Sequence, residues 1–195
     1  MTGPQRPDIA RDLLSRVEDA REHHRKIAYL LSDTEIGMGR HRDHANAAVL
    51  RRVIADHGGW PGRSLVGVEG ADAAARIALY ADDLPDFQRL ALRLISNAVG
   101  NGEATKQQWA HLFDRSSINS GGAQLYGTQY HLGPGGVEML PVRDAQHLDE
   151  RRANIGLPPF ATAQEAVRRR HARESATGQV PDDEPAQAEP LDKAA

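Results

Sequence analysis

Polar side chains of the kind that bind small molecules are concentrated in QLYGTQY, residues 124–130. Two glutamines, two tyrosines and a threonine occupy these seven positions, and amide and hydroxyl groups at this density can fix a ligand in one orientation. The pair Asp114 and Arg115 and the neighbours Arg151 and Arg152 add charge. Arginine binds carboxylate or phosphate through two parallel hydrogen bonds. These residue types favour a polar pocket for a small anionic or amide-bearing molecule.

The candidate site contains ligand-binding and catalytic residues. The predicted ligand-binding residues are Trp60, Arg115, Gln124, Tyr126, Thr128, Gln129, Arg151 and Arg152, with Asp43 and Asn46 as further candidates. Asp114 and Tyr126 are candidates for catalysis. A structural interpretation stays open, in which Asp114 and Asp149 pair with the arginines while the glutamines satisfy loop backbone groups.

Other kinds of site find little support. The chain has no cysteine, so thiol chemistry and zinc ribbons are excluded. HRDH, residues 41–44, spaces two histidines three apart, but no HExxH pattern occurs, and we predict no metal site. The chain also lacks a G-x-S-x-G elbow, a P-loop and a dinucleotide-binding glycine pattern. The cofactor, if one is used, is unknown.

A β-hairpin is expected to position the polar segment, near residues 123–142. In a strand through residues 124–130 the side chains would alternate, so Gln124 and Gln129 would point in opposite directions. GPGG, residues 133–136, supplies the turn, and Pro141 favours an edge strand. Gly127 within the first strand predicts a bulge or the close approach of another group.

A helix after the hairpin is expected to direct the two arginines inward. Leu148 and Ile155 lie seven residues apart and define its buried side, and Arg151 and Arg152 fall on that side. A buried charge without a partner is destabilising by several kcal/mol or more. The arginines therefore need acidic partners, an anionic ligand, or both.

Apolar periodicity predicts helices for most of the remaining chain. The first runs from Ile9 to Leu31 and is followed by a linker, SDTEIGMGRH, residues 32–41. The second is stopped by Gly58, and Asp43 is favoured as its N-cap. Further helices are expected at about 71–82, 85–99, from 104, and at 161–174. The fold class is mainly α (α+β): a bundle-like domain of about six or seven helices with one β-hairpin.

Domain boundaries and partners follow from composition. We expect an N-terminal helix and linker at 1–41 packing on a core domain at 42–160, then a C-terminal helix at 161–174 and a disordered acidic tail at 175–195. The tail has five acidic residues and one lysine, net −4, which leaves about +1 on the rest of a chain of net charge −3. This balance argues against a nucleic-acid partner.

Hydropathy indicates a soluble, cytoplasmic protein. The chain has no apolar run long enough for a membrane span and no signal-peptide pattern at its start. We therefore expect no membrane partner. A small molecule is the expected partner, and the first helix is the candidate surface for a homo-oligomer.

Five motifs resemble a widespread bacterial family of domains of unknown function. They occur in this order: GGWPGRSLVG (58–67), HLFDR (111–115), QLYGTQ (124–129), PVRD (141–144) and DERRANIGL (149–157). The resemblance covers roughly residues 43–160 and is loose over the first helix. It implies a compact, mainly helical domain without an established activity, substrate or cofactor.

Tyr80 departs from the family pattern. Relatives typically have Gln-His-Ala-Asp where this chain has LYAD, residues 79–82, so Tyr80 replaces the histidine and becomes a third catalytic candidate. Tyrosine has an ordinary pKa near 10 and is a poor base at neutral pH. Two function classes stay open: a small-molecule-binding domain or altered enzyme, and a non-catalytic interaction or regulatory module with a structural polar network.

Overall fold

The computed structural model describes residues 3–25, 31–133 and 135–178. Its described residues form seven α-helices, one two-stranded sheet and a short 3-10 helix. The elements are α1 (Pro7–Arg25), α2 (Asp33–His57), α3 (Arg63–Tyr80), α4 (Pro85–Gly100), α5 (Lys106–Asn119), β1 (Tyr130–Gly133), β2 (Gly136–Met139), η2 (Ala145–His147), α6 (Leu148–Asn154) and α7 (Phe160–Gly178). The predicted mainly helical fold with one hairpin is confirmed.

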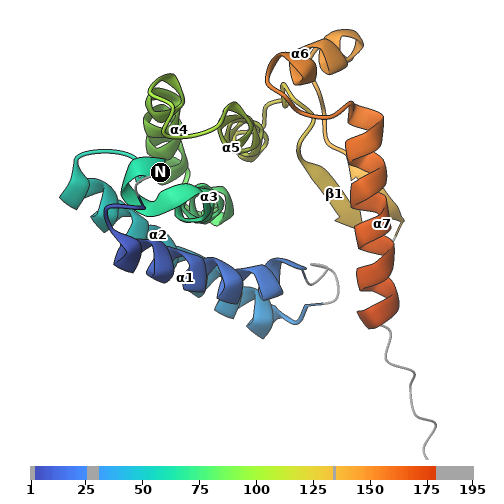
Figure 1. Ribbon diagram of the computed structural model, residues 1–195. Coiled ribbons are helices and arrows are strands. Elements are labelled where there is room, and N and C mark those ends of the chain that lie inside the picture. Colours follow the sequence, from blue (N-terminus) through green and yellow to red (C-terminus); the bar gives the residue numbers. More distant parts are fainter. Residues whose placement is uncertain (1–2, 26–30, 134, 179–195) are drawn as a thin grey trace, which may run out of the picture.

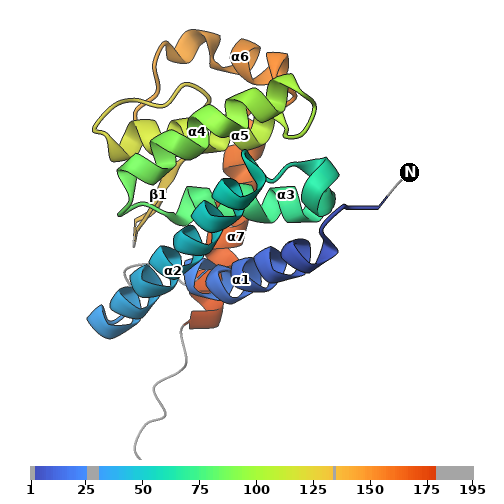
Figure 2. The ribbon, with the colours of Figure 1, turned by 90° about the vertical axis from the view of Figure 1, so that its left-hand side faces the viewer.

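The elements form two sides of the molecule. Helices α1 to α5 make one side, and the hairpin, α6 and α7 make the other, as Figure 1 shows. Helix α3 is central to the first side because it contacts α1, α2, α4 and α5. In the view of Figure 2, α1 and α2 lie on one side of α3, and α4 and α5 on the other. Helix α5 is the element that carries Asp114 and Arg115 toward the hairpin side.

Small residues on α3 allow the surrounding helices to approach closely. Its buried positions are mostly alanine, together with Gly70. A Cβ atom added at Gly70 would lie 3.2 Å from the Ala10 Cβ atom of α1 and 2.8 Å from that of Val66. Leu13 and Val17 of α1 fill the adjoining core, so the predicted apolar stripe of the first helix is buried within this chain from Leu13 to Ala20. Burial of such side chains stabilises the fold by about 1.5–3 kcal/mol each.

Helix α4 agrees closely with its prediction. Pro85 occupies the first turn, and Phe87, Ala91 and Ile95 are buried on one face. This spacing of four residues is the one that lines a single side of a helix. Gln88 lies beside this apolar face and is also buried.

Helix α2 begins earlier than the sequence predicts. The expected linker at 32–41 is helical from Asp33, because Ser32 caps the helix and exchanges hydrogen bonds with Glu35. This reciprocal pair is a capping box, which satisfies two backbone amides that would otherwise lack partners. Asp43 is therefore an interior residue of α2, and the prediction that it caps the helix is wrong. Residues 26–30 of the predicted first helix lie outside the described residues.

The hairpin is confirmed, but its first strand begins later than predicted. The strand pairing is antiparallel and joins Tyr130 to Met139 and Leu132 to Val137. Residues 125–129 form an irregular segment, and Gln124 makes only an isolated bridge to Val142. A strand cannot continue through this segment because Gly127 has a φ of +62°. The predicted alternation of side chains over residues 124–130 is therefore wrong.

The last helix packs on the hairpin. Phe160, the first residue of α7, stacks on Tyr130 with ring centroids 6.1 Å apart. Its backbone amide donates a 2.7 Å hydrogen bond to Asp149 of α6. Helix α7 extends to Gly178, past the predicted end at 174, and residues 179–195 of the predicted tail lie outside the described residues.

Candidate functional site

Asp114 is the centre of the polar cluster. Its carboxylate is 0% exposed and lies on α5, facing the irregular segment 125–128. The backbone amides of Leu125, Tyr126 and Thr128 donate to it at 2.7, 3.1 and 3.1 Å. The Thr128 hydroxyl adds a fourth donor at 3.0 Å. Four donors saturate the carboxylate oxygens, so Asp114 fixes the segment to α5.

Gln124 holds the segment to the residues that directly follow the hairpin. Its side chain is fully buried, and its amide nitrogen donates to the carbonyls of Gln129 and Leu140 at 3.0 and 2.9 Å. Its side-chain oxygen accepts from the Gln129 amide at 2.9 Å. The Gln124 side chain therefore contacts the main chain of Gln129 and not its side chain. All three strong hydrogen-bonding groups of this side chain have main-chain partners.

Arg151 points inward as predicted, and its partners are main-chain carbonyls. Its Nε donates to Leu125 at 2.9 Å, and its Nη2 donates to Arg143 and Asp144 at 2.7 and 2.9 Å. The Asp144 carboxylate lies 3.5 Å from Nη1. Arg151 thus joins α6 to segments on both sides of the hairpin.

Arg152 is more deeply buried than Arg151 and also binds main-chain carbonyls. Its Nε donates to Pro158 at 2.7 Å, and its Nη1 donates to Tyr126 and Gly127 at 2.5 and 3.3 Å. The guanidinium lies over the Phe160 ring, 5.9 Å from its centroid. Burial lowers the pKa of Arg152 below its ordinary value. The carbonyl dipoles compensate for part of the lost hydration of this charge.

The cluster has a solvent-exposed end formed by Asp82 and Arg115. Arg115 forms a bidentate ion pair with Asp82, in which its Nε and Nη2 donate to the two carboxylate oxygens. The remaining nitrogen, Nη1, lies 3.5 Å from the Gln129 side-chain oxygen. Asn119 and Gln88 donate to the same Asp82 oxygen at 2.8 and 3.3 Å. The side chains of Asp82 and Arg115 are 33% and 31% exposed. Gln129 links this end to the buried one, because its side-chain nitrogen donates to the Thr128 hydroxyl at 3.0 Å.

Opposing influences set the ionisation of Asp82. Burial acts to raise the pKa of Asp82, but hydrogen bonds and charge from Arg115, with hydrogen bonds from Asn119 and Gln88, outweigh it. The net result lowers the pKa below the ordinary value. Asp82 is therefore an anion at neutral pH, and an anionic ligand would have to displace it to reach Arg115.

Tyr126 is poorly suited to act as a base. Its ring is 9% exposed and packs edge-on against Trp109, with centroids 5.9 Å apart. Burial, together with the charge of Asp114, raises the pKa of the Tyr126 hydroxyl, although Arg151 opposes this. The neutral phenol is then the form present at neutral pH.

The structure brings most predicted site residues together. Asp114, Arg115, Gln124, Tyr126, Thr128, Gln129, Arg151 and Arg152 are joined by hydrogen bonds, directly or through the segment 124–129. Trp60 instead packs against the helical core, and its buried indole nitrogen has no partner among the described residues. Asn46 is buried on α2 and contacts Arg16 of α1. Tyr80 is the last residue of α3, two positions before Asp82.

Three members of the cluster were missed by the sequence prediction. Asp82, Gln88 and Asn119 lie at its exposed end. Gln88 had a detectable signal, because an uncharged polar residue beside the apolar face of α4 needs a buried partner. Asp82 and Asn119 lie at or near helix ends, where polar residues are common for local reasons.

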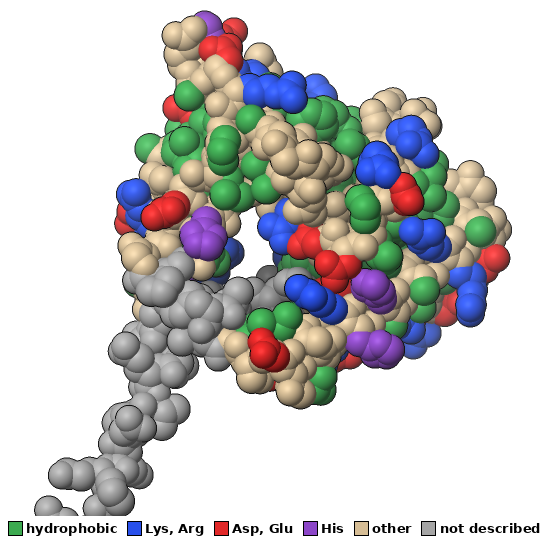
Figure 3. All heavy atoms as spheres, turned by 180° about the vertical axis from the view of Figure 1, so that it is seen from behind, with side chains coloured by type: hydrophobic (Ala, Val, Ile, Leu, Met, Phe, Trp, Pro, Cys, Tyr) green, Lys and Arg blue, Asp and Glu red, His purple; other side chains and the backbone are tan. Residues whose placement is uncertain are grey.

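The described part of the chain has neither a membrane-spanning helix nor a cluster of metal-binding side chains. No helix there is long and apolar enough to cross a membrane. No three histidine, aspartate or glutamate side chains in that part are grouped closely enough to hold a metal ion. The face seen from behind carries acidic and basic side chains interspersed, without one dominant sign of charge (Figure 3).

Comparison with known proteins gives a family but no activity. The sequence model of a family of unknown function, DUF6624, matches residues 7–171. This range includes every member of the polar cluster and all of α1, so it is wider than the range covered by the five motifs. No curated protein and no solved structure matches the chain. The matched range is most of the chain, and the protein therefore belongs to the DUF6624 family of unknown function.

Proposed function

We propose that this domain is a non-catalytic interaction or regulatory module, in which the polar cluster is a structural clamp. The clamp joins α5, the segment 124–129, the hairpin and α6. The hydrogen bonds of Asp114 carry the proposal, because all of its donors come from the chain itself. A general acid or base needs to reach the proton that it transfers. Asp114 is fully buried and saturated, which is the state of a structural carboxylate.

The arginines support the same role. Arg151 and Arg152 use their donors on carbonyls of segments that lack regular secondary structure. Carbonyls in such segments need partners when they are buried, since an unsatisfied polar group costs about 1–3 kcal/mol. A guanidinium with five donors can satisfy several of them at once. The resulting rigidity would suit a domain that presents a fixed surface to a partner.

A small-molecule site remains the second candidate, because Asp82 and Arg115 are about one-third exposed. Such a site would use Arg115 for a small anionic or amide-bearing molecule, with Gln129 beside it. Tyr80, near Asp82 in sequence, would then mark an altered enzyme.

A thermal-shift experiment separates the two candidates. Wild type and the variants Arg151→Ala and Arg115→Gln are screened against carboxylates, phosphomonoesters and primary amides, and each shift is measured from the variant's own midpoint. Under the clamp proposal the variants unfold at lower temperature, yet any ligand that stabilises wild type stabilises them equally. Stabilisation of wild type that is lost in Arg115→Gln, whether or not Arg151→Ala retains it, would overturn the proposal in favour of the pocket.

A further inference from the structure

A hollow of about 570 Å³ lies away from the polar cluster, between α1 and α2. Its volume is within the range of about 300–1,000 Å³ that is usual for small-molecule sites. Eight residues line it: Arg16, Asp19, Gly37, Met38, His41, Arg42, Ala45 and Asn46. None of them belongs to the Asp114 cluster.

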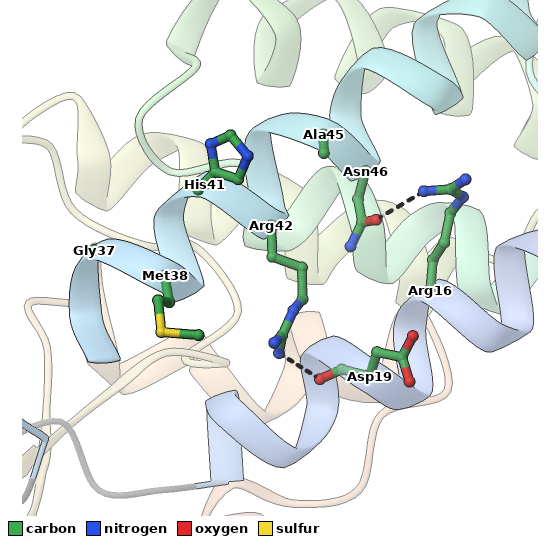
Figure 4. Close-up of a pocket in the computed structure, with 8 residues that line it drawn as sticks. All are labelled: Arg16, Asp19, Gly37, Met38, His41, Arg42, Ala45 and Asn46. Carbon is green, nitrogen blue, oxygen red and sulfur yellow. Dashed lines mark hydrogen bonds between the residues drawn. The ribbon is translucent and has the colours of Figure 1, made fainter. Parts of the chain in front are cut away.

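Helix α2 supplies six of the eight lining residues. Met38, Arg42 and Asn46 are four residues apart and therefore share a helix face, which is turned toward α1 in Figure 4. The His41 ring points away from Arg42 in the same view. Met38 is 61% exposed and gives the hollow an apolar side chain at one end, and Ala45 lies at the other end near Asn46 (Figure 4).

Asn46 is the buried polar residue of the hollow. It is only 5% exposed, and its side-chain oxygen accepts a 3.4 Å hydrogen bond from Arg16. Among the described residues its side-chain nitrogen has no hydrogen-bond acceptor, and in Figure 4 this nitrogen faces the hollow on the side of Arg42. An amide donor that opens onto the hollow from a largely buried side chain, without a protein partner, favours an acceptor from a ligand or from water.

Arg42 provides a positive charge next to this donor. One of its nitrogens donates a 2.8 Å hydrogen bond to the Asp19 carbonyl, and it makes no ion pair with a described residue. Arg16 is different because Asp12 holds its Nε through both carboxylate oxygens at 3.0 Å. The Asp19 carboxylate is on an exposed residue at the rim. Arg42 and Asn46 are therefore the pair able to receive an anion.

We propose that the hollow between α1 and α2 binds a small molecule in which a carboxylate adjoins an apolar group. The carboxylate would accept from Asn46 and from Arg42, and the apolar group would lie against Met38 and Ala45. Charge-assisted bonds of this kind are roughly twice as strong as neutral ones. The site goes beyond the proposed function and does not depend on the role of the Asp114 cluster.

Titration of the full chain with benzoate, followed by NMR of side-chain amides, tests the proposal. Benzoate joins a carboxylate directly to an apolar ring, and benzyl alcohol is its uncharged counterpart. We expect benzoate to shift the Asn46 amide resonances with a dissociation constant on the order of 1 mM, and benzyl alcohol to bind at least tenfold more weakly. Equal binding of the two probes, or no shift at Asn46, would overturn the proposal.

Two variants locate the bound carboxylate. Asn46→Asp keeps the acceptor for Arg16, removes the amide donor and adds repulsion, so benzoate affinity should fall at least tenfold. Arg42→Gln should lower benzoate affinity to a similar extent. This variant provides the test if Asn46→Asp fails to fold. Arg52→Gln is the matched control, since Arg52 is exposed on the same helix and outside the hollow. Benzoate binding that is unchanged in Arg42→Gln, or that is lost equally in the control, would rule the site out.

Discussion

Asp114 and Asp82 are two carboxylates at opposite ends of one polar cluster, and their surroundings differ. Asp114 is fully buried and accepts from three backbone amides and a hydroxyl. Asp82 is one-third exposed and accepts from three side chains, of which Arg115 is the charged one. Main-chain donors are fixed by the fold, whereas side-chain donors can rotate away. The first carboxylate therefore belongs to the architecture, and the second is the one that a ligand could compete with.

The largest expected effect is on the buried carboxylate. Asp114→Asn keeps the shape of the side chain but places an NH₂ group among backbone amides that are themselves donors. We expect the free energy of unfolding to fall by about 4 kcal/mol, because buried amides lose a charged acceptor. Urea unfolding followed by circular dichroism measures this change. A decrease in the free energy of unfolding below about 1 kcal/mol would contradict the claim that Asp114, unlike Asp82, is part of the architecture.

Arg152 tests whether the buried end depends on a guanidinium. Arg152→Lys keeps the charge but cannot reach Pro158 and Tyr126 with a rigid fork, so we expect a loss of about 2–3 kcal/mol. Arg151→Lys is the matched comparison, and its loss should be smaller because its side chain is 19% exposed. Chemical denaturation measures the free energy of unfolding of both variants. Equal losses of stability would contradict the claim that the more deeply buried guanidinium contributes more.

Gly127 tests the backbone path that brings the amides to Asp114. Alanine at this position would adopt a φ of +62° and place its Cβ atom 3.2 Å from the Phe160 ring and 3.3 Å from Leu148. We expect Gly127→Ala to destabilise by about 2 kcal/mol. Gly100→Ala is the control, because nothing lies within 4 Å of its added Cβ atom. Differential scanning calorimetry should show a lower midpoint for the first variant alone.

The smallest effect is expected at the exposed end. Asp82→Asn should cost about 1 kcal/mol at pH 7, as for other partly exposed ion pairs. Because folding lowers the pKa of Asp82, its contribution is present above the unfolded-state pKa of about 3.9 and is lost as pH falls toward the folded-state value. The difference in stability between wild type and Asp82→Asn should therefore shrink below about pH 4. A difference that grows on acidification would contradict this linkage.

Periodic apolar patterns predicted helix α4 and the inward direction of the two arginines of α6 well. The apolar spacing from Phe87 to Ile95 and the position of Pro85 defined α4, and the spacing around Leu148 directed Arg151 and Arg152 inward. Such patterns work because a helix repeats its faces at a fixed interval.

The partners of the inward charges could not be predicted in the same way. Arg152 binds carbonyls of segments with no periodic pattern, and every residue has a carbonyl, so no residue type marks the acceptor. The segment 124–129 resembles a strand in composition, but the amides that turn toward Asp114 prevent strand pairing. The start of α2 could have been predicted, because Ser32 and Glu35 have the spacing of a capping box. Gly37 and Gly39 instead led to the prediction of a linker.

Hydrogen exchange of the wild-type protein tests the central claim most directly. The amides of Leu125, Tyr126 and Thr128 lie in a segment without regular secondary structure, where exchange is ordinarily fast. If Asp114 clamps this segment, these three amides will exchange as slowly as core amides of α4. Exchange at the rate of open loop amides would contradict the clamp.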